Sequence, residues 1–233
     1  MLRTTSDRCV RTTDRPLIRF EGEGFHDRAS LPNPLAYLYD EHLWGGIRNS
    51  SVTWPKGHLH GDLNVRNVLT YSEQPSSDDF DVALIDFDTY DRQNLTLLDF
   101  AQLELNILLT LYNPVYAENR KELVKLSEYL SNTMTAQTLP DLSAKAVGTV
   151  ALIRPIRATV HRMFETVDVD WLPAFWISRV AVGLELSRKT KTHDTKRIIA
   201  LLFAADSMHR LIEYLDVPEL RRSSLPHAIA WPD

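Results

Sequence analysis

Short apolar runs alternate with single polar residues between positions 58 and 88 of the chain. The runs at residues 58–59, 68–69 and 82–85 have the length and the Val, Leu and Ile content that favour buried strands. An acidic connection over residues 73–81 predicts a hairpin-like turn between the second and third of these strands. The pattern therefore predicts three short strands with polar residues at their ends.

The pattern changes to helical spacing further along the chain. Apolar positions recur three and four residues apart in five segments, residues 95–112, 117–134, 143–165, 171–190 and 195–215. The first segment is apolar almost all round, which is typical of a central helix, and Pro155 is expected to interrupt the third. Residues 34–47 predict an earlier helix that starts at Pro34 and ends at a Gly-Gly pair.

The first 33 residues are polar and contain several Pro and Gly, so they predict loop, with one possible short strand at residues 17–20. The aromatic residues of the later helices are expected to pack in the core; they are Phe164, Trp171, Phe175 and Trp176. The expected fold class is α+β and predominantly α, with a few short strands around the motif region.

The composition is that of an ordinary globular chain, with 233 residues, 44% hydrophobic and 24% charged, and a net charge of −5. This charge argues against a nucleic-acid partner, which usually shows as a basic patch. The single cysteine, Cys9, excludes an internal disulfide and indicates a reducing compartment. Neither a membrane span nor a secretory signal is evident, so a cytoplasmic location is expected.

The polar residues at the strand ends form the candidate site, because burying a carboxylate there costs free energy unless it is paired, hydrogen-bonded or bound to a metal. Residues 60–67 read HGDLNVRN and fit the pattern H-G-D-x-x-x-x-N, and residues 85–87 read IDF. Together they resemble the catalytic and metal-binding loops of the protein-kinase-like superfamily. A Gly after the His, and no Gly after Ile-Asp-Phe, favour its aminoglycoside phosphotransferase (choline kinase-like) branch.

A fuller pattern narrows the resemblance. HGDL, NVL and LIDF are followed by DFAQLE at residues 99–104, and this order is similar to a bacterial group called ternary complex associated domains. The resemblance covers residues 31–115 well. It implies a kinase-like C-terminal helical lobe over residues 31–233, preceded by an irregular N-terminal segment, residues 1–30.

The resemblance implies a role for three polar residues. Asp62 occupies the position of the catalytic base, which takes or orients the proton of the acceptor hydroxyl. Asn67 and Asp86 occupy the positions of the Mg²⁺ ligands, in keeping with the preference of Mg²⁺ for hard oxygen donors. The implied cofactors are Mg²⁺ and ATP or another nucleoside triphosphate. The implied reaction is phosphoryl transfer to a small hydroxylated molecule.

Neighbouring residues have implied supporting roles. His60 would orient the loop, and Asp99, at the start of the central helix, would accept hydrogen bonds from backbone N–H groups of the loop. Asn64 stands where the small-molecule branch usually has a histidine. Arg66 stands next to Asn67, where small or neutral residues are usual. It is a candidate to bind a nucleotide phosphate, because arginine recognises phosphate bidentately.

The sequence lacks a recognisable N-terminal β-lobe. In the resembled enzymes that lobe carries the glycine-rich loop and the lysine that contact the nucleotide phosphates. Here the first lysine is Lys56, directly before the motif, and Arg19 could replace such a lysine in charge but not in geometry. The chain is thus a fragment, a lobe that a protein partner completes, or a natural minimal version.

Two functions follow as alternatives. The first is a phosphotransferase lobe that is incomplete without an N-terminal β-lobe. The second is a non-catalytic kinase-like module that binds nucleotide or a protein partner in a bacterial signalling assembly. A third, a metallophosphoesterase suggested by GDLNVRN at residues 61–67, is disfavoured because no G-N-H-[DE] motif follows.

Overall fold

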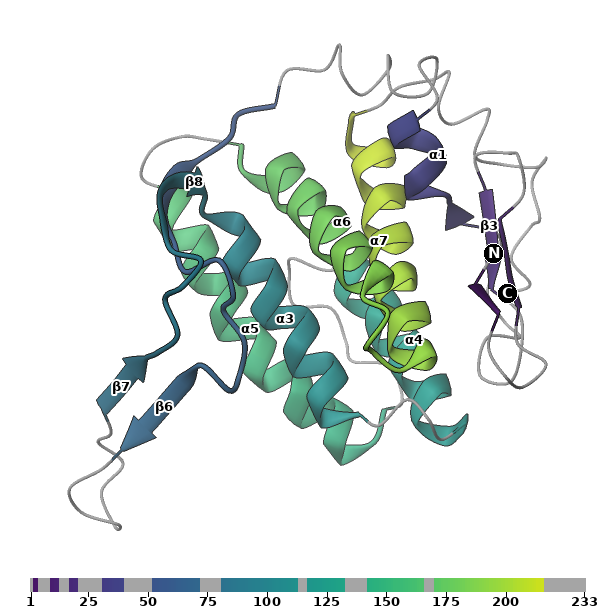
Figure 1. Ribbon diagram of the computed structural model, residues 1–233, viewed down its shortest axis with the longest axis horizontal. Coiled ribbons are helices and arrows are strands. Elements are labelled where there is room, and N and C mark those ends of the chain that lie inside the picture. The colour runs from purple at the N-terminus through teal and green to yellow at the C-terminus, as the bar shows by residue number, and fades with distance from the viewer. Residues whose placement is uncertain are drawn as a thin grey trace.

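The computed structural model describes residues 2–3, 9–12, 17–20, 31–39, 52–71, 81–112, 117–132, 142–165 and 170–215, and the structural statements that follow concern these residues. Helices dominate them, and the strands are short (Figure 1). The predicted fold class, α+β and predominantly α, is confirmed. None of the described helices is both long enough and apolar enough to cross a membrane.

Five helices follow the motif region, as the helical spacing predicts. They are α3 (Leu97–Leu111), α4 (Ala117–Asn132), α5 (Ala144–Glu165), α6 (Leu172–Arg188) and α7 (Asp194–Leu215). The prediction that Pro155 interrupts the third helix is wrong, because α5 continues through it. Pro155 is exposed while Ile153 and Arg157 on either side are buried, so burial of the opposite face holds the helix together across the missing hydrogen bond.

Two clusters of buried apolar residues make up the core. The larger lies between α3, α4, α5 and α7, and it also takes in Ile18 and Leu31 from the N-terminal strands. The second gathers residues of α5, α6 and α7 with Tyr37 of α1 (Pro34–Tyr39). The expectation of a core position is confirmed for the four aromatic residues of the later helices, which all belong to the second cluster; they are Phe164, Trp171, Phe175 and Trp176.

The strands around the motif form two separate two-stranded sheets. β6 (Val68–Tyr71) pairs antiparallel with β7 (Asp81–Leu84), which confirms the predicted hairpin, although residues 72–80 lie outside the described part. β5 (Lys56–Leu59) pairs antiparallel with β8 (Asp91–Leu95). The sequence analysis missed β8 because its sequence, DRQNL, has no apolar alternation and owes its conformation to pairing with β5.

The N-terminal segment contains a four-stranded antiparallel sheet in the order β1-β2-β3-β4. β3 (Leu17–Phe20) is the short strand expected there. The expectation of an irregular segment is wrong for β1 (Leu2–Arg3) and β2 (Cys9–Thr12), which are too short to show periodicity and form by cross-strand pairing. β4 (Leu31–Pro32) completes the sheet. The division of the chain at residue 30 stays a prediction.

The two ends of the molecule are set apart by the helices. Figure 1 shows the N-terminal sheet beside α7, on the opposite side of the helical body from β5 to β8. The predicted helix at residues 34–47 is present as α1 over its first six residues, and its remainder lies outside the described residues. The N-terminal strands therefore do not cover the motif region.

Candidate functional site

The loop that follows β5 is fixed to the start of α3 by a carboxylate. Asp99 accepts hydrogen bonds from the backbone N–H of His60 at 2.5 Å and of Gly61 at 2.9 Å. These are the contacts that the sequence resemblance implies for Asp99. Burial raises the pKa of the Asp99 carboxyl above its usual value, although the two backbone hydrogen bonds act in the opposite direction.

Glycine is required at position 61. Its φ of +85° lies in the left-handed region. A Cβ there would also come within 2.4 Å of the carbonyl oxygen of Thr89. The Thr89 hydroxyl in turn donates to the His60 carbonyl at 3.1 Å. The loop is thus pressed against the residues that follow Asp86.

His60 connects the two motif segments. Its Nε2 lies 2.8 Å from the carbonyl oxygen of Ile85, and its Nδ1 faces the backbone N–H of Asp62 at 3.4 Å. With Nδ1 as acceptor and Nε2 as donor, the ring bridges both loops. The ring also packs against Phe87, with 4.5 Å between centroids. The structure therefore gives His60 the orienting position expected from the sequence.

Asp62 is held from two directions. The Gln102 side-chain amide donates to its Oδ1 at 2.7 Å, and the Asn64 amide donates to its Oδ2 at 3.2 Å. The sequence analysis gave Gln102 no role. Helical spacing could have predicted a role for Gln102, because it lies three residues after Asp99 and so shares its face of α3.

Asn67 is buried beneath Asp62 and beside the second motif segment. The Nδ2 of Asn67 donates to the backbone carbonyl oxygen of Asp62 at 2.9 Å. The backbone carbonyl oxygen of Asn67 accepts a hydrogen bond from the backbone N–H of Ile85 at 3.0 Å. Asp86 is the residue directly after Ile85. Arg66 is exposed, and its backbone N–H donates to the Asn64 Oδ1 at 2.9 Å.

Asp86 has an unusual backbone conformation. Its φ is +65°, the only positive φ of a non-glycine residue in the described part of the chain. Such conformations cost about 1–3 kcal/mol and cluster at functional sites. The Asp86 side chain is exposed, and within the described residues its carboxylate makes no hydrogen bond or ion pair. The backbone therefore presents a carboxylate with unused acceptor capacity.

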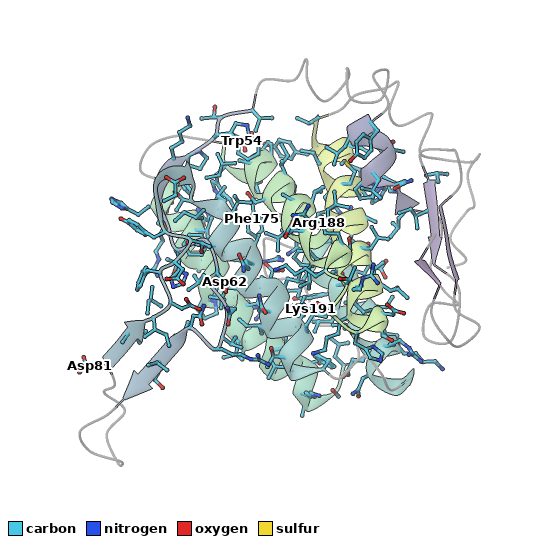
Figure 2. The ribbon with its side chains drawn as sticks, viewed as in Figure 1. Trp54, Asp62, Asp81, Phe175, Arg188 and Lys191 are labelled. Carbon is cyan, nitrogen blue, oxygen red and sulfur yellow. The ribbon has the colours of Figure 1, made fainter. Side chains whose placement is uncertain are left out.

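Both aspartates line one cleft of about 810 Å³ between the motif loops and helices α3 and α6. Its acidic lining residues are Asp62, Asp86, Asp88, Asp99 and Glu185, and its one basic lining residue is Lys189. Neither Asn67 nor Arg66 lines the cleft. Asn67 contacts a lining residue, Asp62, through the hydrogen bond from its Nδ2. Figure 2 shows Asp62 close to the helices and Asp81 far out on the β6–β7 hairpin.

A comparison with known proteins bears on the motif order described above. Residues 11–178 match the family described as ternary complex associated domain 9. The chain belongs to the ternary complex associated domain 9 family. This confirms the narrower resemblance seen in the order HGDL, NVL, LIDF and DFAQLE. No curated protein and no solved structure matches the chain.

The match to ternary complex associated domain 9 contains both motif loops and α3, but not the cleft-lining residues of α6. It begins in β2, covers both motif loops and α3 to α5, and ends within α6. Lys189, at the far rim of the cleft, lies beyond it. The loops around Asp62 and Asp86 are therefore part of the ternary complex associated domain itself.

Proposed function

We propose that this domain is a kinase-like lobe that holds Mg²⁺ and ATP, or another nucleoside triphosphate, at the cleft between Asp62 and Asp86. The observation that carries the proposal is the convergence of the two motif loops. Asp99 anchors the first loop, His60 ties it to the second, and the two outward-facing carboxylates line one cavity. In a complete assembly the acceptor is a small hydroxylated molecule.

The donor set fits Mg²⁺. No group of three or more His, Cys, Asp or Glu in the described residues forms a dedicated metal cage. Mg²⁺ uses such cages rarely, and is bound through one or two carboxylates together with water and phosphate oxygens. Asp86 supplies a carboxylate that lines the cleft, whereas Asn67 does not line it and supports Asp62 from below through its amide nitrogen. A bound Mg²⁺ would neutralise the negative charge of the nucleotide phosphates.

Asp62 has the position of a group that orients an acceptor. Gln102 holds Oδ1 at 2.7 Å, while the hydrogen bonds to Oδ2, from Asn64 at 3.2 Å and from Asn67 at 3.4 Å, are longer. Oδ2 is therefore the more weakly held oxygen, and a substrate hydroxyl could replace one of its two long hydrogen bonds. This arrangement supports a role for Asp62 in positioning rather than in metal cage formation.

The charge of the cleft supports the second candidate function, a nucleotide-binding module without catalysis. Among the described residues, five acidic residues and one lysine line the cavity. A triphosphate needs several cationic or N–H donors to hold its β- and γ-phosphates in line. None of the described residues of the N-terminal sheet lines this cleft, and Figure 1 shows that sheet on the opposite side of the helical body from β5 to β8. Catalysis would then require a partner that brings such donors.

The experiment is a calorimetric titration of ATP into the chain in the presence of Mg²⁺. Asp86→Asn should weaken binding at least about tenfold, or about 1.4 kcal/mol, since it removes the charge while Asn tolerates a positive φ. The matched control is Asp81→Asn, the same change on the exposed hairpin away from the cleft. Equal affinities of the two variants, or no binding by the wild type, would refute the proposed site.

A further inference from the structure

Exposed apolar side chains gather on the β6–β7 hairpin and the turn that follows it. Thirteen large hydrophobic residues are exposed in the described part of the chain, and six of them lie between positions 69 and 90. They are Leu69, Val82, Leu84, Ile85, Phe87 and Tyr90. A concentration of this kind on a soluble domain marks an interaction surface. These six residues are called the hairpin patch below.

The hairpin leaves both of its edges open. β6 and β7 pair with each other and with no other described strand. Figure 1 shows the hairpin projecting away from the helical body. The register sets Val68 opposite Leu84 and Thr70 opposite Val82, so Val82 and Leu84 share one face, and Leu69 lies on the other. None of the described residues covers Leu69, Val82 or Leu84, and an isolated two-stranded ribbon is marginally stable in water.

The charge of the segment specifies the occupant. Residues 67–91 contain seven acidic residues and no Lys, Arg or His. Open strand edges add extended peptides through backbone hydrogen bonds, and alternate side chains of the peptide give specificity. An acidic ribbon with apolar faces therefore fits a strand in which basic and apolar residues alternate.

We propose that the hairpin patch is the docking site of a partner protein, which adds a basic, extended segment as a third strand to the β6–β7 sheet. Apolar residues of the added strand cover Val82 and Leu84, and its basic residues lie on the other face, beside Asp81. The patch continues through Ile85 and Phe87 to the cleft rim at Asp88, so the partner would sit directly beside the cleft. The proposal does not depend on nucleotide binding.

The test uses three labelled peptides and fluorescence anisotropy. The peptide (Lys-Val)₄ has the proposed charge and strand propensity. (Lys-Gly)₄ has the same charge without apolar side chains, and (Glu-Val)₄ has the opposite charge. We expect (Lys-Val)₄ to bind at least tenfold more tightly than either control, with an affinity that falls as salt rises. Similar affinities for (Lys-Val)₄ and (Lys-Gly)₄ would mean charge attraction alone and overturn the proposal.

Variants of the chain locate the binding. The double variant Val82→Ser, Leu84→Ser should lose at least tenfold in affinity for (Lys-Val)₄. The matched control is Leu152→Ser on α5, since Leu152 and Val82 are 53% and 57% exposed. A second variant, Asp81→Lys, should also weaken binding. Equal losses in the hairpin variants and in Leu152→Ser would contradict the assignment.

Amide hydrogen exchange distinguishes strand addition from surface adsorption. Bound (Lys-Val)₄ should slow exchange along β6 or β7, and unchanged exchange there would overturn the proposed mode. The competing occupant is a second copy of this chain. Light scattering that shows a dimer without peptide, converted to a monomer by Val82→Ser with Leu84→Ser, would assign the patch to self-association and reject a separate partner.

Discussion

The positions of individual side chains in the first motif loop are set from α3 rather than from the loop itself. Asp99 and Gln102, one turn apart on that helix, hold the backbone of His60 and Gly61 and the carboxylate of Asp62. A helix is a rigid support, and a loop tied to it at two levels keeps its carboxylate in one orientation.

Asp99→Asn should destabilise the fold by about 1–3 kcal/mol. The backbone N–H groups of His60 and Gly61 each donate to one carboxylate oxygen of Asp99, and an amide has only one acceptor oxygen. The pKa of Asp99 is raised by burial, so the folded state disfavours the ionised carboxyl. The stability of the wild type relative to the variant should therefore fall as pH rises from the usual pKa near 3.8 through the folded pKa. Urea unfolding between pH 4 and 7 measures both effects. A variant as stable as the wild type at every pH would show that the two hydrogen bonds contribute nothing.

Motif order alone predicted where Asp99 and His60 lie, since both follow from contacts that the resembled loops share. Gln102 was not predicted, because its contact depends on the exact rotation of α3 against the loop. The positive φ of Asp86 was not predictable either. Aspartate adopts a positive φ too rarely for the sequence to identify the position where it does so.

At the scale of elements, a buried ionic cluster joins three helices. Glu104 of α3 pairs with Arg157 of α5 and Arg179 of α6, and Glu104 and Arg179 are fully buried. The Arg179 guanidinium also stacks on the Phe203 ring of α7, 3.9 Å from its centroid. Burial alone would raise the pKa of Glu104, but the two arginines outweigh it and hold that pKa below its usual value.

Glu104→Gln should cost about 3–5 kcal/mol, because it leaves two buried guanidinium groups without their counter-charge. The control is Glu185→Gln, which breaks an exposed pair with Arg188 and should cost at most about 1 kcal/mol. With a lowered folded pKa, the contribution of Glu104 is complete above pH about 4.5 and is lost as pH falls further. Chemical denaturation at pH 7 and pH 3 measures this. Equal costs of the two variants at pH 7 would contradict the account.

Helices α6 and α7 meet at a glycine. A Cβ on Gly183 would lie 2.6 Å from the carbonyl oxygen of Ala200 and 2.9 Å from the Ala204 Cβ. Gly183→Ala should therefore destabilise the protein by about 1–3 kcal/mol through overpacking. Gly148→Ala on α5 meets no atom within 4 Å and should stabilise it by up to about 1 kcal/mol. Thermal unfolding of both variants decides the matter, and the same sign of shift in both would refute the packing argument.

Helical periodicity predicted α3 to α7 because each buries one face over many turns. The strands β1, β2 and β8 escaped prediction because two to five residues carry too little pattern, and pairing with a distant partner decides their conformation. At Pro155 tertiary packing also outweighs the local sequence, because burial of one side of α5 keeps the helix continuous through a residue that disfavours helix.

The whole molecule has its N-terminal sheet and the strands β5 to β8 on opposite sides of the helical body (Figure 1). The cleft offers Lys189 as its one basic lining residue, and the hairpin beside it is acidic and apolar. Within the described residues the cleft therefore has fewer cationic groups than the clamp of a triphosphate requires.

The isolated chain should show little or no phosphoryl transfer. Orientation of the reacting groups can account for about 7–11 kcal/mol of a barrier, so loss of the phosphate clamp lowers the rate by many orders of magnitude. ATP turnover is measured against a panel of hydroxylated small molecules, for this chain and for the full-length gene product. Robust turnover by the chain alone that Asp62→Ala abolishes would make this domain a minimal kinase and contradict the prediction.

On the proposed function, a divalent cation and a nucleotide meet between the two motif loops. Mn²⁺ replaces Mg²⁺ at oxygen-rich sites and broadens the amide signals of nearby residues in nuclear magnetic resonance spectra. With a non-hydrolysable ATP analogue present, substoichiometric Mn²⁺ should first broaden residues 61–67 and 85–88, and Asp86→Asn should abolish the effect. Broadening centred on another part of the chain, or unchanged by Asp86→Asn, would contradict the claim.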